Sequence, residues 1–307
     1  MRMSQALTAA ILLCTGAAGP DSAYFHFAEV APGDYAHFGQ VAMPTPENAG
    51  DIANLGVIVG RDAVAIVDTG GSVVIGQQLL AAVRHITDKP IRYVINTHAH
   101  PDHVFGNAAM PQNATFVGHQ NLPAELRARG DYYLRSYRDQ IGDAATADVR
   151  NTLPTLLVRT ETTLDLGERS LRLTAWSPAA HTACDLTVLD ETTGTLFAGD
   201  LVFLDHIPVL DGNLTGWLTI IDRLARMPAR LVVPGHGRHV APWPRALDPE
   251  RRYLRVLAQD TRRAIAAGTP LEKATSSTAQ SERDRWQLFD DYNTRNVTTA
   301  FSELEWE

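Results

Sequence analysis

Short apolar runs rich in valine and isoleucine alternate with turn residues along the first part of the chain. Leu55–Val59 and Val64–Val67 are separated by Gly60-Arg61-Asp62, a spacing that predicts two strands joined by a tight turn. Val73–Ile86 follows with apolar positions at helical spacing, and Ile91–Ile95 predicts a further strand. Strands and helices that are mixed in this way predict an α/β fold.

The mixture continues to about residue 243 and then stops. Further expected strands are Leu171–Trp176, Leu186–Leu189, Leu196–Ala198 and Leu231–Val233, and further expected helices are Leu122–Arg138 and Leu214–Met227. From Pro244 onward, Arg251–Ala267 and Arg283–Leu304 have the periodicity of amphipathic helices. We therefore expect an α/β domain over residues 24–243 and a helical extension over residues 244–307 that packs on its core.

The N-terminus has the three-part order of a secretory signal. Arg2 precedes the apolar run Ala6–Cys14, and small residues follow. The run is too short for a permanent membrane span. We expect a signal peptide over residues 1–20 with cleavage between Ala17 and Ala23, and a periplasmic or secreted protein. A buried N-terminal helix is the alternative.

Composition and charge restrict the class of partner. A hydrophobic content of 45% with 20% charged residues is typical of a soluble globular protein. The formal net charge of −8 argues against nucleic acid, because binding a polyanion requires clustered lysine and arginine. We expect a small-molecule substrate, no nucleic-acid partner and no stable membrane insertion. After cleavage Cys184 is the remaining cysteine, so no internal disulfide is expected.

The segment THAHPDH, residues 97–103, contains four potential metal ligands: His98, His100, Asp102 and His103. Residues two apart point to the same side of an extended segment, and Pro101 disfavours helix at the residue before it. The first two imidazoles can therefore converge on one point. Imidazole with carboxylate suits zinc, with iron as an alternative.

Three more candidate ligands follow apolar segments: His181, Asp200 in LFAGD and His236 in LVVPGHG. An aspartate that ends a buried strand is costly unless it is paired or bound to metal. Each residue alone has an ordinary structural interpretation, such as a cap or a turn residue, and only their joint occurrence predicts a shared metal cleft.

The evidence that other polar residues belong to a site is weaker. The histidines without a partner at ligand spacing, expected to be structural or exposed, are His26, His37, His85, His119 and His239. His206 and Cys184 are further candidates for the cleft, with a small buried residue as the favoured interpretation of the cysteine. The Tyr- and Arg-rich stretch 127–140 either contacts an anionic substrate, forms a lid or, by preference, is a solvated helix face with aromatic packing on the other side.

The order of IVDTGGS (residues 66–72), THAHPDH, His181, Asp200 and His236 resembles the metallo-β-lactamase fold superfamily. The resemblance implies a four-layer αββα sandwich with its site at one edge between two sheets. It implies two zinc ions per chain, the first held by His98, His100 and His181, the second by Asp102, His103 and His236, with Asp200 bridging. It also implies that Asp68 orients the ligand loop, and that Asp102 positions or deprotonates a metal-bridged hydroxide.

Four longer segments, residues 45–60, 88–107, 207–218 and 296–307, resemble the quinoprotein relay system zinc metallohydrolases, which are related to hydrolases found with sulfur oxidation. This resemblance implies an exported hydrolase with a functional link to periplasmic, pyrroloquinoline-quinone (PQQ)-dependent alcohol oxidation. The expected reaction is hydrolysis of an ester, thioester, lactone or similar small-molecule bond. Loops over residues 123–160 and 204–216 are expected to set the specificity.

Three alternatives remain open. A mononuclear iron persulfide dioxygenase retains nearly the same ligand set, and a non-catalytic metal-dependent binding protein is the second alternative. A β-lactamase-like amide hydrolase is the third; it is disfavoured because Asp200 stands where true β-lactamases of the superfamily have cysteine or serine nearby. The short interval between Asp200 and His236 leaves no room for the inserted domain of the nucleic-acid branches.

Overall fold

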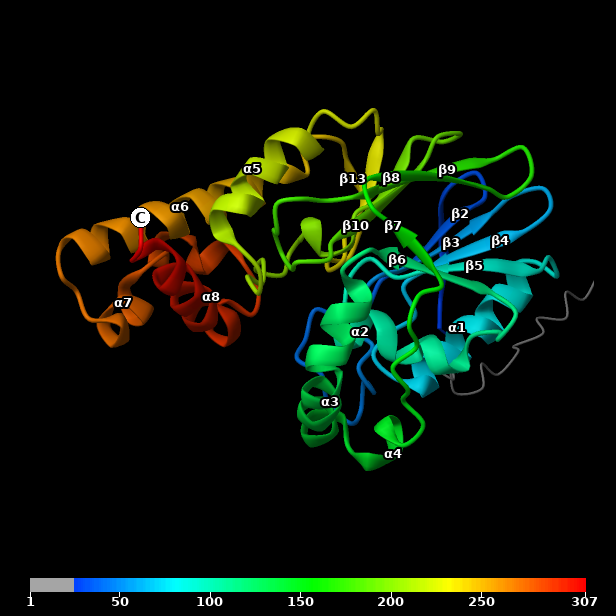
Figure 1. The fold of residues 1–307 in the computed structure, drawn as a ribbon, viewed down its shortest axis with the longest axis horizontal. Coiled ribbons are helices and arrows are strands. Elements are labelled where there is room, and N and C mark those ends of the chain that lie inside the picture. Colours follow the sequence, from blue (N-terminus) through cyan, green and yellow to red (C-terminus); the bar gives the residue numbers. More distant parts are fainter. Residues whose placement is uncertain (1–24) are drawn as a thin grey trace, which may run out of the picture.

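Two β-sheets lie face to face in the computed structural model, which describes residues 25–307 (Figure 1). The expected signal peptide and its cleavage site lie outside the described residues. The first sheet has the order β1 (Ala28–Ala31), β2 (Asp34–His37), β3 (Leu55–Val59), β4 (Val64–Val67), β5 (Ile91–Ile95), β6 (Thr115–His119) and β7 (Leu156–Val158). It is antiparallel from β1 to β4 and parallel from β4 to β7.

The second sheet has the order β13 (Ala241–Pro242), β12 (Leu231–Val233), β11 (Thr195–Phe197), β10 (Leu186–Asp190), β9 (Ser170–Ala175) and β8 (Glu161–Asp165). Its strands are antiparallel except for the parallel pair β11 and β12. The sheets therefore each contain neighbouring parallel strands whose carboxyl ends lie at one edge.

Helices lie outside the two sheets. They are α1 (Val73–Ile86), α2 (Pro101–Val104), α3 (Leu122–Ile141), α4 (Asp143–Thr146), α5 (Leu214–Leu224), α6 (Leu247–Ala266), α7 (Leu271–Ser277) and α8 (Phe289–Leu304), with the 3₁₀ turns η1 (Phe105–Ala109), η2 (Gly199–Leu201) and η3 (Gln280–Arg285). Among the described residues, no helix combines the length and the apolarity that a membrane crossing needs.

The core follows from the period of two along each strand. Ile58 of β3 faces the core between the sheets with Leu173 and Phe197 of the second sheet, whereas its neighbour Val57 packs outward under Leu79 of α1. Burying both faces of both sheets in this way produces the expected αββα sandwich, which is confirmed.

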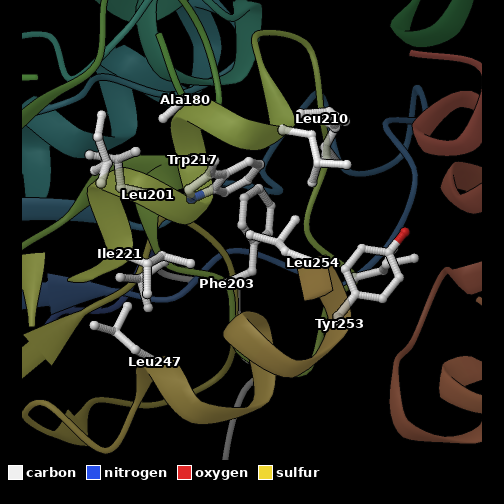
Figure 2. Close-up of a cluster of buried hydrophobic side chains, with 14 of the residues drawn as sticks. Ala180, Leu201, Phe203, Leu210, Trp217, Ile221, Leu247, Tyr253 and Leu254 are labelled. Atoms are coloured by element: carbon white, nitrogen blue, oxygen red, sulfur yellow. The ribbon is translucent and has the colours of Figure 1, made fainter. Parts of the chain in front are cut away.

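The helical extension shares a hydrophobic core with the second sheet. Tyr253 and Leu254 of α6 lie in one buried cluster with Phe203 and Trp217, as Figure 2 shows. The same cluster includes Val232 of β12. The extension packs on α5, and α7 and α8 lie beyond it, away from the two sheets (Figure 1).

Several expected boundaries were incomplete or wrong. Short strands that the sequence pattern did not predict are β1, β2, β6, β7, β8 and β13. The helix expected over Arg283–Leu304 is wrong in its first part, because Trp286 is extended and Leu288 has a left-handed backbone, so α8 begins only at Phe289. The helix expected from Arg251 begins four residues earlier, at Leu247, and α5 ends at Leu224 rather than Met227.

A buried ion network joins the two sheets. The Arg169 guanidinium donates to Asp34 at 2.7 Å and to Asp190 at 2.6 Å, and also to the backbone carbonyl of Val59. Both aspartates are fully buried. Asp34 belongs to the first sheet and Asp190 to the second, so one cation neutralises carboxylates from both layers.

We predict that Arg169→Met lowers the free energy of unfolding by about 3–5 kcal/mol, because two buried carboxylates lose their cation. Urea unfolding followed by circular dichroism measures the change. The control is Arg172→Met on β9, which removes a partly exposed pair with Glu191 and should cost less than about 1 kcal/mol. Equal losses for the two variants would contradict the role given to Arg169.

Candidate metal centre

The candidate ligands lie at the edge where the carboxyl ends of the parallel strands meet. Asp68 follows β4, the segment 97–103 follows β5, Asp200 follows β11, and His236 follows β12. His181 lies in the loop between β9 and β10. Strand polarity therefore delivers side chains from both sheets to one place.

The seven predicted ligands come together in two groups. The first contains His98, His100, His181 and Asp200, and the second contains Asp102, His103 and His236; within each group the ligand atoms lie within 4.8 Å of one another. These are the two sets that the superfamily resemblance implied.

Asp200 lies between the two groups. Its Oδ2 is 3.4 Å from His181 Nε2 and 3.3 Å from His236 Nε2, and its Oδ1 is 3.1 Å from His103 Nε2. Gly235 permits this position, because a Cβ there would lie 1.9 Å from Asp200 Oδ1. The geometry suits a bridging carboxylate.

Outer hydrogen bonds orient the three histidines of the first group. His181 Nδ1 donates to the Val209 carbonyl at 2.7 Å, which leaves Nε2 with a lone pair. His100 Nε2 donates to Asp211 at 3.0 Å, which leaves its Nδ1 with a lone pair. His98 Nδ1 donates to Thr97 Oγ1 at 3.0 Å, because that hydroxyl gives its own proton to Asp68.

The three remaining nitrogens face one another without a proton to share. His181 Nε2 is 3.0 Å from His100 Nδ1 and 3.3 Å from His98 Nε2. Lone pairs held this close in a buried site repel unless a cation lies among them. The first group therefore fits a metal ion.

The second group is oriented in the same way. His103 Nδ1 donates to Asp68 at 2.8 Å, and His236 Nδ1 donates to the Ile52 carbonyl at 2.9 Å. The Nε2 of His103 and the Oδ1 of Asp200 are buried and make no hydrogen bond to the described residues. Buried polar atoms normally have partners, so a metal ion is a fitting occupant here as well.

The electrostatic environment keeps the first group in its metal-binding form. Burial lowers the pKa of His181 to about 3, and burial with the nearby His103 holds the pKa of His98 well below its usual value. In the second group, although burial opposes each shift, the charges of His103 and His236 lower the pKa of Asp102 to about 2, and Asp200 raises the pKa of His236 to about 9 and that of His103 well above its usual value. A metal ion therefore displaces a proton from each of these two rings. Neutral imidazoles and an ionised carboxylate are the states that bind a cation.

Asp68 joins both groups to β4. Its carboxylate accepts from the Thr97 N–H at 2.8 Å, from the Thr97 hydroxyl at 2.7 Å and from His103 at 2.8 Å. Its φ of 59° lies in the left-handed region, which costs about 1–3 kcal/mol for a non-glycine residue. The three hydrogen bonds explain why the backbone keeps this conformation.

Asp211 is a functional candidate that the sequence interpretation missed. Besides accepting from His100, it accepts from Arg129 at 2.6 Å and Arg295 at 2.6 Å. Burial opposes it, but His100 and the arginines hold the pKa of Asp211 well below its usual value. A charged residue in the otherwise apolar run IPVLDGN, residues 207–213, was the available signal.

The C-terminal extension holds the loop that carries these outer partners. Asn296 of α8 donates to the Pro208 carbonyl at 2.7 Å and accepts from the Leu210 N–H at 2.8 Å. Val209 and Asp211, which orient His181 and His100, lie on either side of Leu210. The extension therefore takes part in positioning the first group.

A cavity of about 340 Å³ opens beside the two groups. Its lining includes His100, Asp102, Asp200, His206 and His236 together with Met43, Pro44, Ile52, Pro101, Arg129, Tyr132, Tyr133, Ser136, Tyr137, Gln140, Val209, Asp291, Tyr292 and Arg295. In stretch 127–140, the aromatic packing expected on one side of α3 is present, since Tyr133 and Tyr137 are buried, and residues of this stretch also line the cavity. A cavity of this volume can hold a small molecule next to both ligand groups.

Of the two further candidates for the cleft, His206 lines the cavity and Cys184 does not. His206 lines the cavity and is buried, its Nδ1 donates to the Ile207 carbonyl at 2.5 Å, and burial lowers its pKa to about 4. Cys184 does not reach the cavity lining, because it is fully buried in an apolar cluster with Leu122 and Leu126 of α3.

The histidines that were expected to be structural or exposed lie outside both ligand groups. His26, His85 and His239 are exposed. His37 and His119 are buried; His37 contacts Asp51 at 2.8 Å, and His119 accepts from the Asn121 N–H at 3.0 Å.

We predict that Asp200→Ala or His98→Ala sharply reduces the metal bound per chain, because each removes a ligand that the remaining side chains do not replace. The control is His85→Ala at the exposed end of α1, which should keep the wild-type content. Elemental analysis of the purified proteins measures all three. Equal metal content in the three variants would contradict the assignment of Asp200 and His98 as metal ligands.

We predict that Asp211→Ala weakens metal affinity about 10- to 100-fold, because His100 loses the carboxylate that fixes its orientation. Competition with a chromophoric chelator gives the affinity. Asp222→Ala on the exposed face of α5 is the matched control and should leave the affinity unchanged. A wild-type affinity for Asp211→Ala would mean that His100 needs no outer partner.

The fold and part of the sequence are similar to known proteins. A segment of 50 residues is 46% identical to the linear primary-alkylsulfatase of Pseudomonas sp. (strain ATCC 19151). This segment makes up 16% of this chain and 10% of that protein. The solved structure of a stereoselective inverting sec-alkylsulfatase from Pseudomonas sp. is 16% identical with a TM-score of 0.70, covering 91% of this chain. This chain spans 50% of that sulfatase.

A metallo-beta-lactamase from Pontibacter korlensis is 20% identical with a TM-score of 0.59, and the likeness covers 75% of this chain and 98% of that one. These structural likenesses show the shared fold. The sequence model of the metallo-beta-lactamase superfamily matches residues 49–236, which is more than half of the chain and includes all seven candidate ligands. The chain therefore belongs to the metallo-beta-lactamase superfamily and has the fold and the candidate metal-binding groups of a metal-dependent hydrolase.

Proposed function

We propose that this protein is a binuclear zinc hydrolase that cleaves an ester-type bond of a small molecule. One observation carries the proposal: five imidazoles, four of them buried, each turn a ring nitrogen toward one of two neighbouring points, and Asp200 lies between those points. Such a pair of sites suits hydrolysis, because two cations stabilise both the attacking and the departing oxygen.

The chain contributes specific groups to that chemistry. Bound zinc supplies an activated water at neutral pH and polarises the bond under attack. Asp102 lines the cavity, and its contacts with His236 at 3.3 Å and His103 at 3.7 Å both use Oδ2. Its Oδ1 is thus available to accept the proton of the attacking water.

Among ester-type substrates, a sulfate ester of an alcohol has the most support. Two of the similar proteins are named as alkylsulfatases. The likeness to the sec-alkylsulfatase covers 91% of this chain. Residues 1–243 make up less than four fifths of this chain, so the similarity must include part of the helical extension. Carboxylic esters, thioesters and lactones remain candidates on the chemistry of the site alone.

The proposal includes export and a link to a periplasmic quinoprotein system, both of which rest on sequence patterns. Hydrolysis of an alkyl sulfate releases an alcohol. An alcohol is the class of compound that a PQQ-dependent alcohol dehydrogenase oxidises. The two reactions would follow each other in one compartment.

We predict that the protein purified without added metal contains about two zinc ions per chain and hydrolyses at least one member of a panel of alkyl sulfates, esters, thioesters and lactones. Asp102→Asn should lower kcat about 100-fold or more through loss of the proton acceptor. Elemental analysis and a pH-stat assay measure both, with Asp222→Asn as the surface control.

Other outcomes point to the other candidates. One iron per chain with oxygen uptake on a persulfide substrate would replace the hydrolase with a dioxygenase. Turnover of a β-lactam alone would make the protein an amide hydrolase. Bound zinc with no turnover of any panel member would support a binding protein.

A further inference from the structure

Among the described residues, one tyrosine hydroxyl is buried without a hydrogen-bond partner. Tyr137 of α3 is 6% exposed, and its hydroxyl oxygen is buried without a partner among the described residues. Its neighbour on the same helix, Tyr133, donates to Asp211, and Tyr253 of α6 donates to Asn293. Buried hydroxyls normally have partners, so this exception needs an explanation.

Tyr137 forms part of the cavity wall beside the candidate metal centre. One side of the ring packs edge-to-face on Phe105 with 5.5 Å between centroids. The residue lines the cavity beside Asp102, Asp200 and His236. The anchored residue thus carries an unpaired hydroxyl in the wall of the space where a substrate would lie next to both ligand groups.

The charge state of Tyr137 suits a hydrogen-bond donor. Burial and the negative charge of Asp102 raise the pKa of its phenol well above the usual value. The hydroxyl therefore keeps its proton at any physiological pH. The Oδ2 atoms of Asp102 and Asp200 contact histidines of the two ligand groups.

We propose that Tyr137 is a catalytic residue whose hydroxyl donates a hydrogen bond to an oxygen of the scissile ester group, a sulfate or carboxylic ester, bound in the cavity. This inference rests on the proposed hydrolase function. Negative charge grows on that oxygen as water attacks, and a donor already fixed in a dry site stabilises the charge without reorganisation. In the free protein this hydroxyl is unpaired, and it gains its partner when the substrate binds.

The test is Tyr137→Phe in the zinc-loaded full-length protein. We expect unchanged zinc content and an equal or higher melting temperature, because the change removes an unpaired polar group. We expect kcat/KM to fall about 100-fold, the effect of losing one oxyanion donor. The control is Tyr93→Phe on β5, which makes the same chemical change away from the cavity lining and should keep wild-type kcat/KM.

A purely structural role for Tyr137 predicts a different pattern. In that case Tyr137→Phe would lower the melting temperature or the zinc content in proportion to activity. Tyr253→Phe illustrates that pattern, because its hydroxyl has the partners Asn293 and Asn296 and its loss should lower the melting temperature. Wild-type kcat/KM in Tyr137→Phe would also overturn the proposal.

A binding measurement separates this inference from the proposed function. The probe is phenyl methylphosphonate, a tetrahedral anion that resembles an ester under attack, titrated into zinc-loaded protein by calorimetry. Binding to the wild type that weakens at least tenfold in Tyr137→Phe supports the donor role, even if no ester of the panel is hydrolysed. Equal binding to both proteins, or no binding to the wild type, overturns it.

Discussion

To bind metal, five imidazoles, four of them buried, must each aim one unprotonated ring nitrogen at a neighbouring point, and the rest of the structure serves that constraint. Each imidazole donates its other N–H to a fixed acceptor: a backbone carbonyl for His181 and His236, a carboxylate for His100 and His103, and a hydroxyl for His98. Without those acceptors the rings could flip or change tautomer, and the lone pairs would no longer converge.

These acceptors come from distant parts of the fold. Asp68 follows β4 in the first sheet, and Ile52 lies in the loop that precedes β3. Val209 and Asp211 lie in a loop that α8 fixes through Asn296 and Arg295. Because that helix lies beyond residues 49–236 matched by the superfamily, the C-terminal extension adds to the site a support that the shared domain does not contain.

The cavity combines a rigid centre with an adaptable wall. The ligands follow strands of the two sheets, whereas Tyr137 comes from α3 and Tyr292 from α8. Part of that wall falls in the loop ranges 123–160 and 204–216, in which specificity was expected. This division allows one metal-binding framework to serve different substrates, since changes on α3 or α8 leave the strand ends in place.

The sequence by itself determined the central strands, α1 and the seven candidate ligands, because apolar runs with regular spacing and clustered histidines are local signals. It did not predict β1, β2 or β8, whose short strands depend on neighbours in the sheet. It also missed Asp211 and the role of Tyr137. An outer acceptor and an unpaired hydroxyl are defined by contacts between segments far apart in the chain. Only the tertiary structure could show which aspartate meets His100 and which tyrosine, buried beside charged groups, has no partner.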